Sequence, residues 1–459
     1  MKSSSRITFL RMIWFRRTLR LLSPIQTLVL GFLLLTVLGG VILSLPISTV
    51  DGRFQPFLDA LFTSASAITT TGLIVVDTGS YYNLFGQIVI MLLIQVGGLG
   101  YMTLIVFIII LFGQSLSWHG GILMQESLAV PSRGEMRQFV LRVIQFTLVF
   151  ELIGAWLLAL FWLREYDFGR AVWLGVFHAV SAFCTAGFSL FSEGFNAYRD
   201  RWFFNAAVSF ISIGGAVGFL VLSEARTVTG RILRGNRVHR LSTHSKLALL
   251  VFFGLTALGT AVILAAEYKP QTPLPDQLAA ASFQSVTASS TTGFNTVPIG
   301  DMQPASLVMI TGLMFIGAPT GGTGGGIKAT TFGVIVLILL AVLRGARDVN
   351  AFGRRIGMST LIKSVAVMIA AVLWLGVAIL ILAATEDASF LSIVFEAVSA
   401  LGTVGLSMGM TPGLTAVGKM VIILSMLAGR IGPLAMAFTL VGGSGVKAYR
   451  YPEEEVFVG

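Results

Sequence analysis

The sequence predicts an all-α integral membrane protein of four tandem units with pseudo-fourfold symmetry around one axis. Three observations predict this fold: the composition, a motif that occurs four times, and the apolar runs that flank each copy. Hydrophobic residues make up 55% of the 459 residues and charged residues 11%, against about 25% charged in ordinary soluble proteins. This composition excludes a large soluble domain and indicates a chain that lies mostly in lipid.

The repeated motif has the form F-x-x-x-[ST]-A-x-x-T-x-G-[FL], and its copies occupy residues 62–73, 177–188, 283–294 and 395–406. Their glycines are spaced almost equally (187 − 72 = 115, 293 − 187 = 106, 405 − 293 = 112). One match would be unremarkable in a chain with 51 glycines. Four matches at this spacing indicate tandem units of similar length.

Each copy lies between two apolar runs long enough to span a bilayer, which takes about 20 helical residues. The eight predicted spans are 25–45, 84–112, 140–163, 202–222, 246–266, 306–343, 361–384 and 416–441. The segment before each glycine is too short to cross but long enough for a re-entrant half-helix. Each unit is therefore predicted to run membrane helix, pore helix, extended loop, membrane helix. The predicted divisions are a basic N-terminus 1–22, pore units 23–115, 138–225, 244–345 and 360–446, and a tail 447–459.

Lys and Arg gather before the first unit and between units, whereas the connections inside units carry acidic residues mixed with few basic ones. Because Lys and Arg favour cytoplasmic loops, we expect a multi-pass protein of the plasma (inner) membrane with both termini cytoplasmic and the glycine loops open to the outside. The basic start followed by an apolar run could be a secretory signal, but the run is too long and no clear cleavage pattern ends it. The net charge of +10 could also indicate nucleic-acid binding. Topology explains the charge without that partner, so membrane lipid is expected and nucleic acid is not.

The residues that usually carry catalysis or bind metals are few. Cys184 is the single cysteine, and the four histidines are scattered, so neither an internal disulfide nor a metal cluster is expected. In the other copies the place of Cys184 is taken by Thr69, Ser290 and Gly402, which favours a small residue filling a tight position. No nucleophile–base pair is evident, and we expect neither an enzyme nor a bound cofactor.

The glycine loops themselves predict a chemistry. Irregular backbone inside a membrane is tolerated only where it is buried or lines water, and four such loops around one axis would present rings of carbonyl oxygens. Such rings replace the hydration shell of a monovalent cation, glycine permits the positive φ that aligns successive carbonyls, and the C-terminal end of a half-helix favours a cation. The predicted ion-binding positions are Thr70, Thr71, Gly72, Thr185, Ala186, Gly187, Thr291, Thr292, Gly293, Thr403, Val404 and Gly405.

A simpler interpretation is that these glycines only allow close helix packing. That interpretation suits Gly97, Gly98 and Gly100. It does not explain why Thr, Gly and Phe keep fixed offsets in four places.

A second glycine-rich segment, GAPTGGTGGGIKATTF, occupies residues 317–332 inside the last long apolar run of the third unit. Each glycine costs a helix about 1 kcal/mol, so the helix is predicted to break here, under the glycine loops. A phosphate-binding loop would need G-x-x-x-x-G-K-[ST]. From Gly321 that match fails, because Ile327 follows Gly326 and Ala329 follows Lys328.

Two basic residues lie in apolar surroundings, Lys328 and Arg430. A charge there is costly unless it faces water or a partner. Lys328 could instead extend to a membrane interface. Arg430 follows Gly405 by 25 residues (430 − 405 = 25), so its helix could return it to the side of the pore.

With its four helix–pore–helix units and one filter glycine in each, the chain resembles the Ktr, Trk and HKT superfamily of cation transporters from about Ser23 to Val446. In that family the 317–328 region is an intramembrane loop that obstructs the path below the filter, with an arginine close by. The resemblance implies gate roles for Gly321, Gly322, Gly324, Gly325, Gly326, Lys328 and Arg430. Arg430 would repel cations or lock the loop.

Trk-type members carry two further helices before the first unit, but only 61 residues precede Phe62; the bacterial Ktr-type pore subunit is the nearer resemblance. Some plant members have Ser at the first filter glycine and pass mainly sodium, whereas Gly72 is retained here, which favours potassium. The resemblance further implies potassium as the transported ion at the filter positions, sodium as an activator, a homodimer, and a separate cytosolic ring subunit that binds nucleotide. Two alternatives stay open: a sodium-preferring channel or symporter of the same family, and a solute carrier of another class.

Overall fold

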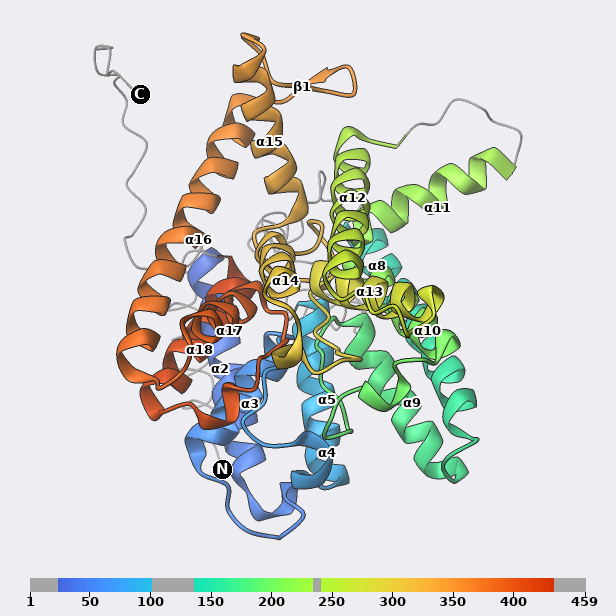
Figure 1. The fold of residues 1–459 in the computed structure, drawn as a ribbon, viewed down its shortest axis with the longest axis vertical. Helices are drawn as coiled ribbons and strands as arrows, with labels where there is room; N and C mark the ends of the chain where they lie inside the picture. Colours follow the sequence, from blue (N-terminus) through green and yellow to red (C-terminus); the bar gives the residue numbers. More distant parts are fainter. Residues whose placement is uncertain (1–23, 101–135, 234–240, 433–459) are drawn as a thin grey trace, which may run out of the picture.

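The computed structural model describes residues 24–100, 136–233 and 241–432. These residues are helical apart from loops and one small hairpin, in which β1 (Asn350–Ala351) pairs antiparallel with β2 (Arg354–Arg355). The helices surround a centre at which the loops of all four units meet (Figure 1). This arrangement is the predicted all-α fold with four helix–pore helix–helix units.

Each unit begins with a membrane helix followed by a pore helix. The first helices are α2 (Pro24–Ser44), α8 (Met136–Trp162), α12 (Thr243–Ala266) and α16 (Met358–Thr385). The pore helices are α3 (Phe57–Ile68), α9 (Phe168–Phe183), α13 (Leu274–Ser289) and α17 (Phe390–Gly402). With 12 to 16 residues, the pore helices are too short to cross a bilayer, and each ends three or four residues before its motif glycine.

The second helices pass beside the neighbouring unit. They are α5 (Leu84–Leu99), α10 (Trp202–Ala216), α14 (Pro304–Ile316) and α18 (Ala416–Ile431), and the shorter elements are α4 (Thr78–Tyr81), η1 (Pro46–Ser48), η2 (Asn196–Tyr198), η3 (Ile299–Asp301) and η4 (Thr411–Gly413). Each second helix packs on the pore helix of the next unit: α5 on α9, α10 on α13, α14 on α17, and α18 on α3. The last contact joins the fourth unit to the first and closes the ring.

The second helices correct one sequence prediction. Residues 202–222 do not form one straight span, because α10 stops at Ala216 and α11 (Phe219–Leu233) leaves at 99°. Gly218, with φ of 102°, makes this bend, a conformation that residues with a Cβ rarely adopt. The sequence prediction missed it because the apolar run continues through the glycine.

Similar breaks occur in the other three units. Positive-φ glycines follow α5, α14 and α18 directly, namely Gly100 (φ 76°), Gly317 (φ 68°) and Gly432 (φ 104°). The break in the third unit confirms the one predicted from its glycine-rich segment, and α15 (Ala329–Leu343) resumes after it. The remainders of the predicted spans 84–112 and 416–441 lie outside the described residues.

Among the described residues, three helical stretches are long and apolar enough to span a membrane without a break: Gln138–Trp162, Thr243–Ala266 and Met358–Thr385. Large apolar side chains on α16 are exposed, among them Ile369, Leu373 and Leu380. Exposed apolar surface of this extent is expected where a helix faces lipid.

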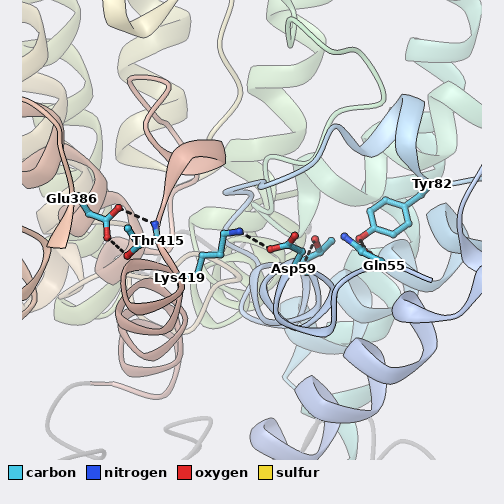
Figure 2. A network of polar contacts seen from close by, with 7 residues as sticks. Gln55, Asp59, Tyr82, Glu386, Thr415 and Lys419 are labelled. Carbon is cyan, nitrogen blue, oxygen red and sulfur yellow. Dashed lines mark hydrogen bonds and ion pairs between the residues drawn. The ribbon is translucent and has the colours of Figure 1, made fainter. Parts of the chain in front are cut away.

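Polar contacts reinforce the junction of the fourth and first units. Lys419 of α18 forms an ion pair with Asp59 of α3 at 2.6 Å, with only 16% and 21% of the two side chains exposed (Figure 2). On one side Tyr82 donates to Gln55 at 2.7 Å. On the other, Thr415 donates to Glu386 through its hydroxyl at 2.5 Å and its N–H at 2.9 Å. Burial alone would raise the pKa of Glu386, but hydrogen bonds from Thr415, Thr385 and Gly418 together outweigh it and hold that pKa below its usual range.

We predict that Lys419→Met destabilises the closed ring, because it leaves Asp59 as a mostly buried charge without its ion-pair partner. The expected loss in the free energy of unfolding is about 3 kcal/mol. It is measured as a lower unfolding temperature of the protein in detergent. Asp59→Asn should have a similar effect, and the double variant should lose less than the sum of the two. Asp348→Asn, at the exposed pair with Arg355 (71% and 46% exposed), is the matched control and should change little. Equal stability of Lys419→Met and wild type would refute the role of this pair.

Candidate ion-binding site

The backbone that follows each pore helix has an unusual and repeated conformation. The motif threonines have positive φ: 54° at Thr70, 52° at Thr185, 59° at Thr291 and 49° at Thr403. A β-branched residue rarely adopts this conformation. The motif glycines also have positive φ, at 91°, 67°, 84° and 93° for Gly72, Gly187, Gly293 and Gly405. One residue outside this region separates each Thr from its Gly, so the same alternation of backbone conformation is repeated in all four units.

The four glycines form a closed ring of backbone contacts. A Cβ on Gly187 would fall 2.6 Å from the carbonyl oxygen of Thr292, far closer than real Cβ atoms approach. The Cβ atoms built on the other three would collide with the same kind of partner: Gly72 with Ala186 O, Gly293 with Val404 O, and Gly405 with Thr71 O. These four extended segments, residues 70–72, 185–187, 291–293 and 403–405, are called the filter strands below. Each filter strand touches the next, and the fourth touches the first. The predicted positions of all four units are brought together.

Hydroxyl groups of the pore helices hold this backbone from behind. The N–H of Gly72 donates to Ser66 Oγ at 3.0 Å, and the N–H of Gly405 donates to Ser399 Oγ at 3.1 Å. Ser181 Oγ instead donates to the carbonyl of Phe188 at 2.9 Å. Because these amides bond away from the axis, the strand carbonyls on the other side are available to a cation.

A further polar position behind the filter was missed by the sequence prediction. The residue directly after the motif Phe is buried in every unit, and the four residues are Thr63, His178, Gln284 and Glu396. Three of them bond the segment beyond the filter strand: Leu190 N donates to His178 Nε2 at 3.1 Å, Gln284 Nε2 donates to Thr296 at 3.3 Å, and Glu396 accepts from Ser407 at 2.9 Å. The available signal was a polar residue at the same motif offset in every copy, where a buried helix face would otherwise be apolar.

The glycine-rich segment between α14 and α15 contacts the inner ends of the filter strands. Gly325 N donates to Thr291 Oγ1 at 3.0 Å, and Thr185 Oγ1 donates to Thr323 Oγ1 at 3.3 Å. A Cβ on Gly325 would fall 2.8 Å from the carbonyl of Gly402. The segment therefore lies against strands from the second, third and fourth units, where glycine is required by close approach.

The same segment is also bonded to the second unit. Thr323 Oγ1 donates to the carbonyl of Phe183 at 2.9 Å, and Thr323 N donates to the carbonyl of Gly215 at 3.1 Å. Phe219 N, at the start of α11, donates to the carbonyl of Gly321 at 2.9 Å.

The two basic residues singled out from the sequence both point into this segment. The guanidinium of Arg430 donates to the carbonyl oxygens of Thr323, Gly97 and Gly98, the last at 3.1 Å. It thereby connects the segment to the end of α5. Lys328 is half-buried and its Nζ donates to the carbonyl of Gly324, so its side chain folds back onto the segment.

Cys184 is fully buried, and a Cβ on Gly98 of α5 would fall 2.6 Å from its Sγ. This contact agrees with the interpretation of a small residue in a tight position. In the part of the chain that the structure describes, no group of three His, Cys, Asp or Glu side chains is placed to hold a metal ion.

Four helix–pore helix–helix units around a ring of backbone carbonyls define the class of cation-conducting membrane proteins. Residues 9–442 match the family model TrkH, described as a cation transport protein. The chain belongs to this TrkH/Ktr family of cation transporters, and it is thus an ion transporter and not an enzyme, as the sequence predicts.

Several characterised proteins are similar over nearly their whole length. The Ktr system potassium uptake protein B of Bacillus subtilis is 40% identical over 95% of this chain and 97% of its own. The protein of the same name from Vibrio alginolyticus is 37% identical, with 95% and 94% covered. The potassium/sodium uptake protein NtpJ of Enterococcus hirae is 34% identical, with 97% and 99% covered.

A solved structure shows the same fold. The potassium transporter TrkH from Vibrio parahaemolyticus superposes with a TM-score of 0.72 at 20% identity, covering 90% of this chain and 84% of that one.

We predict that Gly187→Ala abolishes or strongly reduces ion uptake, because its Cβ would collide with Thr292 O across the ring at a positive φ. Gly254→Ala in α12 is the matched control, since nothing lies within 4 Å of its Cβ position. Radioactive rubidium uptake into cells with equal membrane levels of both variants measures the effect. Equal uptake by the two variants would contradict the ring geometry.

Proposed function

We propose that this protein carries potassium into the cell across the plasma membrane, through a selective pore at the twelve predicted filter positions. The observation that carries the proposal is the closed ring in which four Thr-x-Gly strands touch one another through backbone atoms. Oxygen rings of this kind suit a dehydrated monovalent cation. The side chain of Thr403 supports the proposal, because its Oγ1 is buried without a hydrogen-bond partner in the protein.

Potassium is favoured over sodium as the main ion. All four strands keep glycine at the ring position, so none of them narrows the ring with a side chain. The names of two of the three relatives above specify potassium uptake, whereas NtpJ is named for both potassium and sodium. A sodium-preferring transporter of the same family is the second candidate on that ground.

We further propose that the segment 317–328 is the gate. It contacts the strands from the cytoplasmic side in the proposed topology, in which both termini are cytoplasmic and the pore units keep the divisions predicted from the sequence. Gly322 and Gly324 approach backbone or side-chain atoms within 3.0 Å of their Cβ positions. The loop could not come so close with larger residues, and it lies across the path that an ion would follow from the ring.

The elements that would move the gate are continuous with it. The loop runs directly into α15, and α15 and α16 project together toward the β1–β2 hairpin (Figure 1). The start of α11 bonds Gly321, and α11 also projects from the bundle. A cytosolic nucleotide-binding ring subunit that contacts these projections would displace the loop through α15. Homodimer formation and activation by sodium complete the proposal by analogy with the family.

We predict that this chain supports potassium uptake in living cells. Expression of this chain with a candidate nucleotide-binding subunit should restore growth of a potassium-uptake-deficient bacterium at low potassium, and Gly72→Ser should shift the uptake toward sodium. Uptake of potassium and sodium is measured by flame photometry. Membrane insertion without rescue in any condition would contradict the proposed potassium uptake.

We predict that loss of the Arg430 charge weakens the closed state of the gate. Arg430→Gln should raise potassium flux in the absence of the regulatory subunit by about tenfold, because it removes charged hydrogen bonds that hold Thr323 to α5. Arg226→Gln on α11 is the matched control, since its guanidinium bonds Gln145 at 2.8 Å and lies apart from the loop. Liposome flux assays without the partner measure both. Unchanged flux in Arg430→Gln would show that Arg430 does not hold the gate loop closed.

A further inference from the structure

The residue behind each filter strand differs chemically from unit to unit. The backbone of the four strands is nearly equivalent, but the buried side chain after the motif Phe is a hydroxyl, an imidazole, an amide or a carboxyl. Glu396 of α17 is the carboxyl. In the described part of the chain, it is the one acidic side chain that is buried, with none of its surface exposed.

The hydrogen bonds of Glu396 are directed to the segment that leaves the fourth filter strand. Ser407 Oγ donates to Oε2 at 2.9 Å, and Thr411 Oγ1 donates to Oε1. Ser407 Oγ itself accepts from Gly409 N at 3.0 Å, so its hydrogen is directed to the glutamate. Ser407 and Thr411 follow Gly405 closely (407 − 405 = 2, 411 − 405 = 6). One side chain therefore connects the pore helix to the backbone just beyond the ring.

Among the described residues, no Lys, Arg or His side chain lies within ion-pair distance of the Glu396 carboxyl group. The described residues contain two ion pairs within 4.0 Å, Arg355 with Asp348 and Lys419 with Asp59. A buried carboxyl group is costly unless it is hydrogen-bonded, so the two hydroxyl donors fix the position of the segment that carries them against Glu396.

Resting on the proposed function, we propose that Glu396 is a positioning residue that sets the discrimination between potassium and sodium. It acts by holding the fourth filter strand through Ser407 and Thr411. Potassium and sodium carry equal charge, so discrimination between them depends on where the ring oxygens lie. A strand that has lost its bonds to Glu396 can move its oxygens closer together, and it then accommodates the smaller sodium ion more readily.

The third unit shows what a neutral residue does at the same place. Gln284 bonds Thr296 through Nε2, and its Oε1 is buried without a partner. An amide at this position thus makes one bond to the segment beyond its strand, whereas the carboxylate of Glu396 accepts two. Replacement of Glu396 by Gln is therefore a native-like change of known geometry within this fold.

The test is Glu396→Gln, compared with Glu386→Gln. Both glutamates belong to the fourth unit and both accept from a threonine hydroxyl. Glu386 follows the end of α16 and bonds Thr415 at the start of α18 (Figure 2), not the segment that follows the filter strand. Potassium and sodium are each titrated as inhibitors of rubidium uptake. The readout is the ratio of their half-inhibitory concentrations, which does not depend on expression level. We expect Glu396→Gln to reduce discrimination about tenfold, as for the loss of one charge-assisted hydrogen bond. Glu386→Gln should leave it unchanged.

Ser407→Ala and Thr411→Val provide a second route if Glu396→Gln fails to reach the membrane. Each should lower discrimination, and each should add little to Glu396→Gln, because all three disrupt one set of contacts. Wild-type discrimination in Glu396→Gln, or in both hydroxyl variants, would overturn the proposal. Failure of the wild-type chain to transport potassium at all would instead contradict the proposed function.

Discussion

The structure depends on one constraint, which is that backbone polar groups inside a membrane must be satisfied or must line the ion path. The filter strands meet it on both sides. Their amides bond pore-helix hydroxyls such as Ser66 and Ser399, and their carbonyl oxygens lie against the glycine of the neighbouring strand in the ring. Each pore helix leads into one strand. Each second helix packs against the pore helix of the neighbouring unit, and this packing holds the strands in contact.

The backbone of the ring follows fourfold pseudo-symmetry, but the side chains and loops around it do not. The glycine-rich loop comes from the third unit and contacts strands of the second and fourth units as well as its own. Arg430, which bonds this loop, comes from the fourth unit, and its other partners come from the first. Symmetry at the ring suits a spherical ion. Asymmetry below the ring suits a device that one subunit of a partner could move through α11 or α15.

Glycine has two separate tasks in this molecule. At Gly187 or Gly325 the absence of a side chain permits contact between backbones that would otherwise collide. At Gly218 or Gly432 the positive φ ends a helix in open space or beside a loop. The second task shortens the helices around the path and explains why few uninterrupted helices reach spanning length. A long apolar run is therefore a poor guide to helix length wherever glycine interrupts it.

The sequence by itself determined the repeated units, the class of fold and the places of the four Thr-x-Gly strands, because fixed offsets of Phe, Thr and Gly and the membrane-length apolar runs are properties of the chain in one dimension. It also located the loop at 317–328 and the two basic residues beside it. Only the tertiary structure decided that Arg430 bonds carbonyls of two different units, that Lys328 folds back onto the loop, and that α10 and α11 meet at 99°. It alone placed Thr63, His178, Gln284 and Glu396 behind the strands. Those contacts join residues far apart in the chain. Hydropathy and motif spacing describe only neighbouring residues, so they cannot predict which distant backbone group a side chain will contact.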